Sequence, residues 1–529
     1  MKRRTFLHAG AAALASPLAA PALAQAPGKR VLTFVPQADI AVLDPVWTTT
    51  YQTRDHGFLV FDTLFGLDGA YRPQPQMAAG ASSENDGRAW KITLRDGLKF
   101  HDGEPVLARD AAASIRRWGA RDGFGQALIA ATDAIEAPDD KTIVVRLKHP
   151  FPLLPDALAK TPPSMCPIMP ERLAATDPFK QVTEMVGSGP YRYKADERVP
   201  GAQVVYERFD AYVPRADGTP DGTSGPKVAH FDRIEWRIMP DPSTVSAALQ
   251  RGEIDWWLAP DADLLPLLRR QSRLKVETTV PTGFIATMRF NQLQPPFDNP
   301  AIRRAIIGAI TQADYMIGMV GTDPALWKDG VGYFCPGTPL ANDAGMQALT
   351  SPRNLDGVKK ALSDAGYKGE KVVILTPTDI ASAKALAEIT ADLLSRIGMT
   401  VDAQTMDWAT LVQRRVKTDP IDQGGWSIYH TSWSGLDMVN PAGHIFLRAN
   451  GKAAAPGWPD SPTLEALRSA WFVAPDAAAQ KSLAEQIQTQ AFKDVPYIPL
   501  GQYFMPTAYQ GNLTGILKGS PVFWNVRRG

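Results

Sequence analysis

The residues best suited to chemistry near the start of the chain lie in the stretch LRDGLKFHDGEPVLARDAAASI, residues 94–115. Here His101, Asp102 and Glu104 fall within four positions of one another. A histidine and two carboxylates this close together could bind a metal ion or act as an acid/base pair. They could equally form only a tight turn between two strands.

The neighbouring residues favour the turn. Gly103 can adopt a positive φ without steric cost, and His-Asp-Gly is typical of turns. Alternating apolar residues predict a β-hairpin over 88–100. Asp110 falls in the first turn of a helix expected over 108–118, where a carboxylate offsets the helix dipole. Because each polar residue has a local structural role, we interpret the cluster as structural rather than metal-binding.

Catalytic signatures are missing from the rest of the sequence. It contains no His-Glu-x-x-His helix, no phosphate loop and no Gly-x-Ser-x-Gly nucleophile elbow. The nearest approach to a metal pair is His430 and His444, which are fourteen positions apart in a loop-rich stretch. Histidines at such spacing are more often hydrogen-bonded than metal-bound. We therefore predict no catalytic residues and no metal ligands, and a secreted hydrolase is the least favoured class.

A second group of candidates is aromatic and lies in GGWSIYHTSWSGLD, residues 424–437. It contains Trp426, Tyr429, Trp433 and Asp437. Aromatic walls around one buried carboxylate suit a cationic, partly apolar small ligand, because the rings supply area and π-faces and the carboxylate supplies an ion pair. The alternative is that the aromatic residues belong to the core, which for Trp426 is an equally good interpretation.

The composition describes a soluble globular chain. Its 529 residues correspond to three or four domain-sized units, and 45 prolines favour many turns over a helical bundle. The formal net charge is +1, and removal of Lys2, Arg3 and Arg4 with a leader would make it about −2. A near-neutral surface argues against nucleic acid as a partner, since that binding requires a dense cationic face.

The first 26 residues, MKRRTFLHAGAAALASPLAAPALAQA, are expected to be an export signal. They have a basic start, an apolar middle too short to span a bilayer, and small residues that predict cleavage after Ala24. Arg3-Arg4 followed by Phe6-Leu7 is similar to a twin-arginine signal, with an ordinary secretory signal as the alternative. We expect the mature protein to be soluble in the periplasm.

The two cysteines do not settle whether the chain contains a disulfide. Only Cys166 and Cys335 are present, and an oxidising compartment would permit a disulfide between them. Two buried free thiols are the preferred interpretation, although the sequence spacing leaves the pairing open.

Periodicity predicts a mixed α/β chain. After about residue 290, strands and helices alternate in the order that favours right-handed crossovers. The tail 495–500 is judged too rich in proline for a central strand. Other expected elements are strands at 31–35, 141–147, 232–239 and 372–375, and helices at 54–65, 242–251, 354–365, 381–397, 462–472 and 476–493.

The opening stretch also resembles the signature of family 5 extracellular solute-binding proteins, the dipeptide, oligopeptide and nickel class of ABC importers. The similarity extends over nearly the whole mature chain, in seven blocks that occur in the family's order. Leu107 departs from it, standing where the family has a helix-capping threonine. The other blocks are Leu43-Asp-Pro45, Gly187-Ser-Gly-Pro-Tyr191, Asp232–Asp255, Phe290–Ala305, Ala361–Tyr367 and Leu394–Gly398.

The resemblance implies two α/β lobes of the type II periplasmic-binding-protein kind, with an extra subdomain in the first lobe (the cluster C architecture). Lobe I would comprise residues 27–287, including the extra subdomain at about 68–186. Lobe II would comprise 288–497, and 498–529 would return to lobe I. Two crossing strands would join the lobes.

The resemblance also implies a site between the lobes. Asp437 lies where peptide-binding members hold the peptide's amino group, in a loop that is one residue longer here. Arg415 would capture a carboxylate or remain a solvated helix charge. The expected ligand-binding residues are Trp408, Arg415, Trp426, Tyr429, Trp433 and Asp437 from lobe II and Trp47, Tyr51 and Phe284 from lobe I and the crossover.

The function implied is that of a periplasmic substrate-binding protein. It would enclose a small ligand, first of all a peptide or an amino-acid-like molecule, and deliver it to an ABC permease in the inner membrane. It would act as a monomer, without a cofactor and without chemistry. The alternative within the same fold is a carrier of nickel, a metal chelate or haem that uses His430 or His444.

Overall fold

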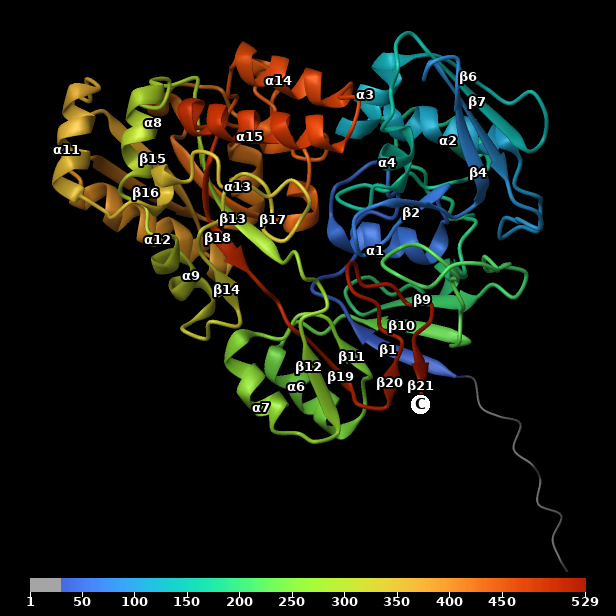
Figure 1. Cartoon of the computed structure of the whole chain (residues 1–529). Helices are drawn as coiled ribbons and strands as arrows, with labels where there is room; N and C mark the ends of the chain where they lie inside the picture. The colour runs from blue at the N-terminus through green and yellow to red at the C-terminus, as the bar shows by residue number, and fades with distance from the viewer. Residues whose placement is uncertain (1–29) are drawn as a thin grey trace, which may run out of the picture.

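A computed structural model describes residues 30–529 and shows two lobes, each built on one large sheet (Figure 1). The export-signal prediction concerns residues outside this range. The lobe I sheet has seven strands in the order β12-β19-β11-β1-β10-β9-β8. Their bounds are β1 Val31–Val35, β8 Tyr191–Tyr193, β9 Gln203–Arg208, β10 Arg233–Arg237, β11 Trp256–Trp257, β12 Leu274–Glu277 and β19 Thr507–Gln510.

The lobe II sheet has six strands in the order β14-β18-β13-β17-β15-β16. Helices α9 (Gln312–Val320) and α12 (Ala381–Arg396) pack against this sheet. The parallel pair β15–β16 flanks α12 in the chain, as the sequence predicts for a strand–helix–strand unit. The strand bounds are β13 Phe284–Phe290, β14 Trp327–Lys328, β15 Lys371–Pro377, β16 Thr400–Met406, β17 Ile428–Ser434 and β18 Ile498–Tyr503.

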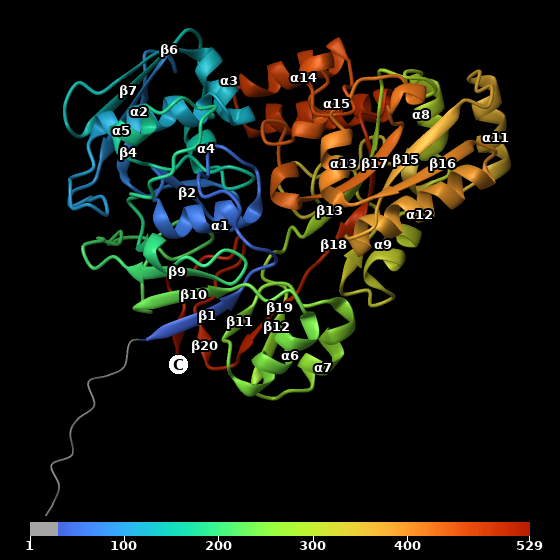
Figure 2. The same cartoon turned by 180° about the vertical axis from the view of Figure 1, so that it is seen from behind.

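Two segments join the lobes. The chain passes from β12 in the first sheet to β13 in the second, and returns from β18 to β19. Figures 1 and 2 show the two crossing segments running side by side between the lobes. The crossings therefore lie at 278–283 and 504–506.

The expectation that the proline-rich tail could not form a central strand was wrong. β18 pairs with β13 on one side and β14 on the other. The register with β13 shifts between Ala286 and Thr287, opposite Pro499 and Gly501. Because a bulge removes the need for a ladder hydrogen bond at that point, the strand accommodates a proline that lacks an N–H donor.

The extra subdomain follows α1 (Tyr51–Val60), which begins and ends a few residues before the expected 54–65. Its sheet has the order β4-β5-β7-β6 and is accompanied by four helices. These elements are β4 Ala78–Glu84, β5 Ala89–Leu94, β6 Thr132–Glu136, β7 Thr142–Leu147, α2 Ala108–Gly119, α3 Gly123–Ala131, α4 Leu154–Ala159 and α5 Glu171–Ala174.

The predicted hairpin over 88–100 was also wrong. β5 ends at Leu94 and pairs with β4 and β7, whereas Lys99 pairs with Pro105 across the His-Asp-Gly turn. β5 is thus central, because β4, which directly precedes it in the chain, covers one edge and the sequence-distant β7 covers the other.

The His101 cluster is a structural turn, as the sequence indicated. The Gly187 N–H donates to His101 Nδ1 at 3.2 Å, and His101 Nε2 lies 3.0 Å from the Gly189 carbonyl oxygen. Burial lowers the pKa of His101 to about 4, so the ring is neutral near pH 7. The histidine therefore ties the turn to the loop that leads into β8, and both segments belong to the quoted family blocks.

Asp44, of the Leu-Asp-Pro block, anchors the loop before α1. It forms a fully buried ion pair with Arg117 of α2, at 2.6 Å between Oδ2 and Nη2. Its carboxylate also accepts hydrogen bonds from the Val46 and Val182 N–H groups. Because each charge is paired and further hydrogen-bonded, the burial is tolerated. The loop that carries Trp47 and Tyr51 is thereby fixed to the extra subdomain.

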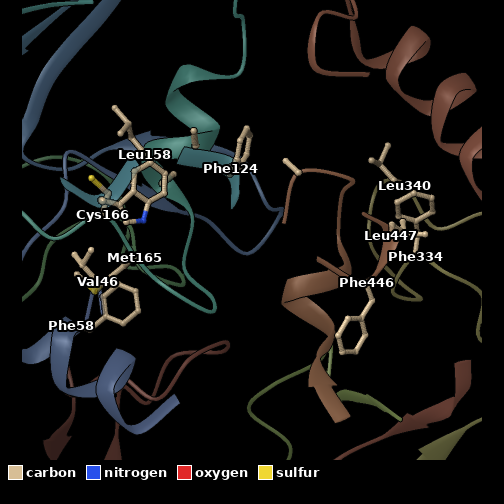
Figure 3. Close-up of a cluster of buried hydrophobic side chains, with 14 of the residues drawn as sticks. Val46, Phe58, Phe124, Leu158, Met165, Cys166, Phe334, Leu340, Phe446 and Leu447 are labelled. Carbon is tan, nitrogen blue, oxygen red and sulfur yellow. The ribbon is translucent and has the colours of Figure 1, made fainter. Parts of the chain in front are cut away.

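The hydrophobic core has a part in each lobe (Figure 3). Val46, Phe58, Phe124 and Leu158 lie on the lobe I side, and Phe446 lies on the lobe II side. Cys166 and Cys335 are both buried and unpaired, as preferred from the sequence. Within residues 30–529, no helix has the length and apolar character needed to cross a membrane.

Candidate ligand-binding site

Tyr51 and Asp437 connect the two lobes directly. Tyr51 begins α1 in lobe I, and its hydroxyl donates to Asp437 Oδ2 of lobe II at 2.9 Å. The same hydroxyl accepts a hydrogen bond of 2.8 Å from the Ser434 N–H. The segment Gly435–Met438 forms a 3-10 turn immediately after β17, and this turn places the Asp437 carboxylate at the interface.

Asp437 is a buried carboxylate with unused hydrogen-bonding capacity. Its side chain is 3% exposed, and Oδ1 has no hydrogen-bond partner among residues 30–529. Burial raises the pKa of Asp437 to about 7, although Lys160 and the Tyr51 hydroxyl act in the opposite direction. A buried, incompletely partnered carboxylate is costly for the protein alone, so this position is suited to a ligand that donates hydrogen bonds or carries positive charge.

One pocket opens beside this pair, on the side of the crossing segments. We call it the hinge pocket; it has about 690 Å³ of empty space, some of it open to solvent. Its walls include Tyr51, Arg54, Phe284, Ser434 and Leu436. The rings of Tyr51 and Phe284 meet edge to face with centroids 5.9 Å apart, and the Arg54 guanidinium lies 4.8 Å from the Tyr51 ring centroid.

A second pocket, the cleft pocket, lies between the Trp47 loop and α3 of lobe I and residues 442–448 of lobe II. It has about 600 Å³ of empty space. Lys160 and Asp122 form a buried ion pair in its wall. Gly443 connects this pocket to the carboxylate segment, because a Cβ built there would lie 3.4 Å from the Asp437 carbonyl oxygen and 3.9 Å from Lys160 Cε.

The lobes also touch at a distance from the crossing segments. Phe472, at the end of α14 (Pro462–Phe472), stacks on Phe151 with centroids 6.2 Å apart and lies 5.9 Å from Phe124. Nearby, Arg448 of lobe II donates to Gln126 of lobe I at 3.4 Å. Both views of the molecule show α14 beside α3 (Figures 1 and 2). The two lobes are therefore in contact away from the crossing segments, as expected of a closed form.

Four of the nine expected site residues lie at this interface, and a fifth, Trp433, packs within lobe II. Tyr51 and Phe284 line the hinge pocket, Trp47 lines the cleft pocket, and Asp437 lies between them. Trp433, near the end of β17, packs edge to face on Phe446 with centroids 5.4 Å apart.

The other four lie together in a separate cluster of lobe II. Trp426 is fully buried and donates its indole N–H to the Lys417 carbonyl, and its ring meets Tyr429 at 5.1 Å. Arg415 stacks near Tyr429 and Trp408, at 5.5 and 5.9 Å from their ring centroids. None of the four lines either interlobe pocket. For Trp426, full burial favours its interpretation as a core residue.

His430 and His444 are buried and engaged with hydroxyl groups. His430 Nε2 lies 2.8 Å from Thr390 Oγ1, and His444 Nε2 lies 2.9 Å from the Tyr497 hydroxyl. Burial lowers the pKa of both histidines to about 3. In residues 30–529, no three histidine, cysteine, aspartate or glutamate side chains form a group that could hold a metal ion. Neither histidine therefore belongs to such a group within the described residues.

Sequence reasoning missed the charged residues of the cleft pocket: Arg121, Asp122, Lys160 and Arg448. They come from three regions of the chain that the fold brings together. No local pattern marks them, although Asp122 precedes a helix and could have been recognised as an N-cap. Only the partners across the interface reveal their shared position.

A family model described as "Bacterial extracellular solute-binding proteins, family 5 Middle" matches residues 72–453. The chain belongs to this family. The resemblance seen in the sequence blocks is thus confirmed, and family 5 solute-binding proteins serve in transport rather than in catalysis.

Two relatives of this family 5 protein match over nearly their full length. The probable peptide ABC transporter periplasmic-binding protein y4tO of Sinorhizobium fredii is 38% identical over 93% of this chain and 92% of its own. The glutathione-binding protein GsiB of Salmonella paratyphi A is 28% identical over 95% and 94%.

Solved structures confirm the fold. The protein AgaA in complex with agropinic acid, from A. tumefaciens, has a TM-score of 0.77 at 19% identity, covering 94% of this chain and 99% of that one. DppA of Helicobacter pylori in complex with the peptide STSA has a TM-score of 0.76 at 20% identity, covering 94% and 98%. At this identity the likeness establishes the two-lobe fold of the family, as the sequence predicted.

Proposed function

We propose that the protein binds a small peptide or an amino-acid-like ligand in the periplasm and delivers it to an ABC permease. One observation carries the proposal: a buried carboxylate, Asp437, lies between the lobes with an oxygen that no described residue satisfies. An ammonium group supplies both the charge and the hydrogen-bond donors that this oxygen lacks.

The relatives support this ligand class. The relative y4tO is a probable peptide ABC transporter protein, and the DppA structure holds a peptide. Tyr51 would orient the carboxylate, since its hydroxyl is itself fixed by the Ser434 N–H. Phe284 and Trp47 would supply apolar contact area on either side of the ammonium group.

Delivery of the ligand requires the two lobes to close around it. A ligand that contacts Tyr51 in lobe I and Asp437 in lobe II binds the closed form better than the open form, and only such differential affinity shifts the equilibrium. The permease would distinguish the closed complex from the open protein. The leader would direct export, by the twin-arginine route with cleavage after Ala24, and the mature protein would act as a monomer without nucleic acid.

Isothermal titration calorimetry tests the proposal. We expect native mass spectrometry of freshly purified protein to show a co-purified ligand, or a screen of short peptides to yield one. Asp437→Ala should then lower the affinity for that ligand at least tenfold. The matched control is Asp392→Ala on the exposed face of α12. If Asp437→Ala binds every accepted ligand as tightly as the unaltered protein, the amine-binding role is wrong.

A further inference from the structure

Two arginines from different lobes line the cleft pocket without an acidic partner. Arg121 lies in the turn between α2 and α3 of lobe I, and Arg448 follows the 3-10 turn Ile445–Leu447 of lobe II. Both side chains are half-buried. Within residues 30–529, neither guanidinium has a carboxylate within 4.0 Å. Their hydrogen bonds go to neutral acceptors, the Trp47 carbonyl at 2.8 Å and the Gln126 side chain at 3.4 Å.

The remaining charges of the pocket cancel. Lys160 is 9% exposed and is paired with Asp122, which is 3% exposed. Asp122 is further committed to capping α3, where its carboxylate accepts from the Phe124 and Gly125 N–H groups. The pocket therefore carries an excess of two positive charges contributed by Arg121 and Arg448. Partly desolvated like charges that share a closing cleft oppose closure unless an anion lies between them.

We propose that Arg121 and Arg448 together bind a carboxylate of the ligand, which makes them specificity-determining residues for acidic ligands. This inference rests on the proposed function, because the ligand's ammonium group is assigned to Asp437. The two subsites share a wall at Gly443, which is close to both the Asp437 backbone and Lys160. One short molecule that carries both an ammonium group and a carboxylate would occupy the two subsites together. Guanidinium groups suit the second subsite because their planar fork matches a carboxylate.

The position of the two arginines also links charge to closure. In an open form they belong to separate lobes and are hydrated independently. A carboxylate contacts both of them only when the lobes are closed, so its binding energy is available only in that state. An acidic ligand would thus turn a repulsive pair into a bridge between the lobes.

The test uses four peptides and four proteins. The peptides are Ala-Glu-Ala, Ala-Gln-Ala and the C-terminally amidated form of each, which separates a side-chain carboxylate from the C-terminal one. The proteins are the unaltered chain, Arg121→Gln, Arg448→Gln and the control Arg396→Gln, an exposed residue of α12. Affinities are measured by isothermal titration at low salt, and folding is checked by circular dichroism.

We expect the unaltered protein to bind a peptide at least tenfold more weakly when one of its two carboxylates, side-chain or C-terminal, is removed. The ratio of the affinities with and without that carboxylate should fall below threefold in Arg121→Gln and Arg448→Gln. It should stay at its full value in Arg396→Gln. Arg448→Lys, which keeps the charge without the fork, should give an intermediate ratio, and it replaces Arg448→Gln if that variant does not fold.

Two results would overturn the inference. Either all four peptides bind the unaltered protein equally, or both arginine variants retain the full ratio. If binding is then still lost in Asp437→Ala, the proposed function stands and only the carboxylate subsite is refuted. If no peptide binds and a co-purified ligand is held equally by Asp437→Ala, the proposed function fails and this inference fails with it.

Discussion

Asp437→Asn provides a direct test of the site, because it should stabilise the ligand-free protein while weakening the binding of the ligand. The pKa of Asp437 is raised by burial from 3.8 to about 7 in the folded protein. The folded state therefore holds the proton more tightly than the unfolded chain. The resulting stabilisation is fully present below the unfolded pKa and is lost as pH rises through about 7. Asparagine has a similar shape and carries no charge at any of these pH values.

The magnitude follows from the shift. A change of one pKa unit corresponds to about 1.4 kcal/mol, so a buried charged Asp437 costs on the order of 4 kcal/mol at pH 8. At pH 5, where Asp437 is mostly protonated in the folded protein, its raised pKa lowers the stability by less than about 2 kcal/mol. The stability of Asp437→Asn relative to the unaltered protein should therefore grow by roughly 3 kcal/mol between pH 5 and pH 8. Any pH-independent difference in stability that the asparagine amide introduces does not affect this pH-dependent growth.

The assay is urea unfolding followed by tryptophan fluorescence, on protein stripped of ligand by unfolding and refolding. Asp392→Asn, on the exposed face of α12, is the control and should follow the unaltered protein at each pH. A saturating ligand should reverse the order, since only the carboxylate gains an ion pair. Parallel pH profiles for Asp437→Asn and the unaltered protein would refute both the raised pKa and the reasoning built on it.

Three further outcomes are expected. Tyr51→Phe removes the hydroxyl that donates to Asp437, so the midpoint of the pH dependence of ligand affinity should move to higher pH. Calorimetry from pH 5 to 8 measures this midpoint. An unmoved midpoint contradicts the role of Asp437 in binding the ligand. Lys227 and Asp62 form a fully buried ion pair, with 2.7 Å between Nζ and Oδ1. Lys227→Met leaves Asp62 buried without its cationic partner and should lower the free energy of unfolding by about 3–5 kcal/mol. The double variant with Asp62→Asn should recover part of this loss in urea unfolding, which would show that the unpaired Asp62 charge is its cause. Phe472→Ala removes the aromatic contact between the lobes. Small-angle scattering of the ligand-free protein should therefore show a larger radius of gyration. An unchanged radius would mean that this contact does not hold the lobes together.

The family and the two-lobe fold could be predicted from the sequence because their signals are local. The His-Asp-Gly turn, the Leu-Asp-Pro block and the capped helices each depend on residues a few positions apart. The strand–helix alternation of lobe II follows from periodicity in the same way. The errors came where a distant partner decides the pairing. β5 became central, and β18 became an interior strand despite its proline, through strands far away in the sequence.

The candidate site shows the same division. Sequence alone pointed to Asp437 and to the aromatic residues near it in the chain, because a carboxylate beside aromatic residues and a family signature are readable in one stretch. It could not separate Trp433 from Trp426, which lie in one strand region but in different clusters. Neither could it find Arg121 and Arg448, which are separated by more than 300 positions and meet only across the cleft.

What the sequence determined by itself is therefore the scaffold and the transport family, each specified by short-range patterns of turn, cap and hydrophobic period, and it offered one candidate carboxylate. The tertiary structure decided the rest, namely which charges are buried, which are paired, and which face each other between the lobes. The reason is physical. The free energy of a charge depends on the solvent and partners that surround it, and in a two-lobe protein those surroundings are completed by distant segments only when the lobes close.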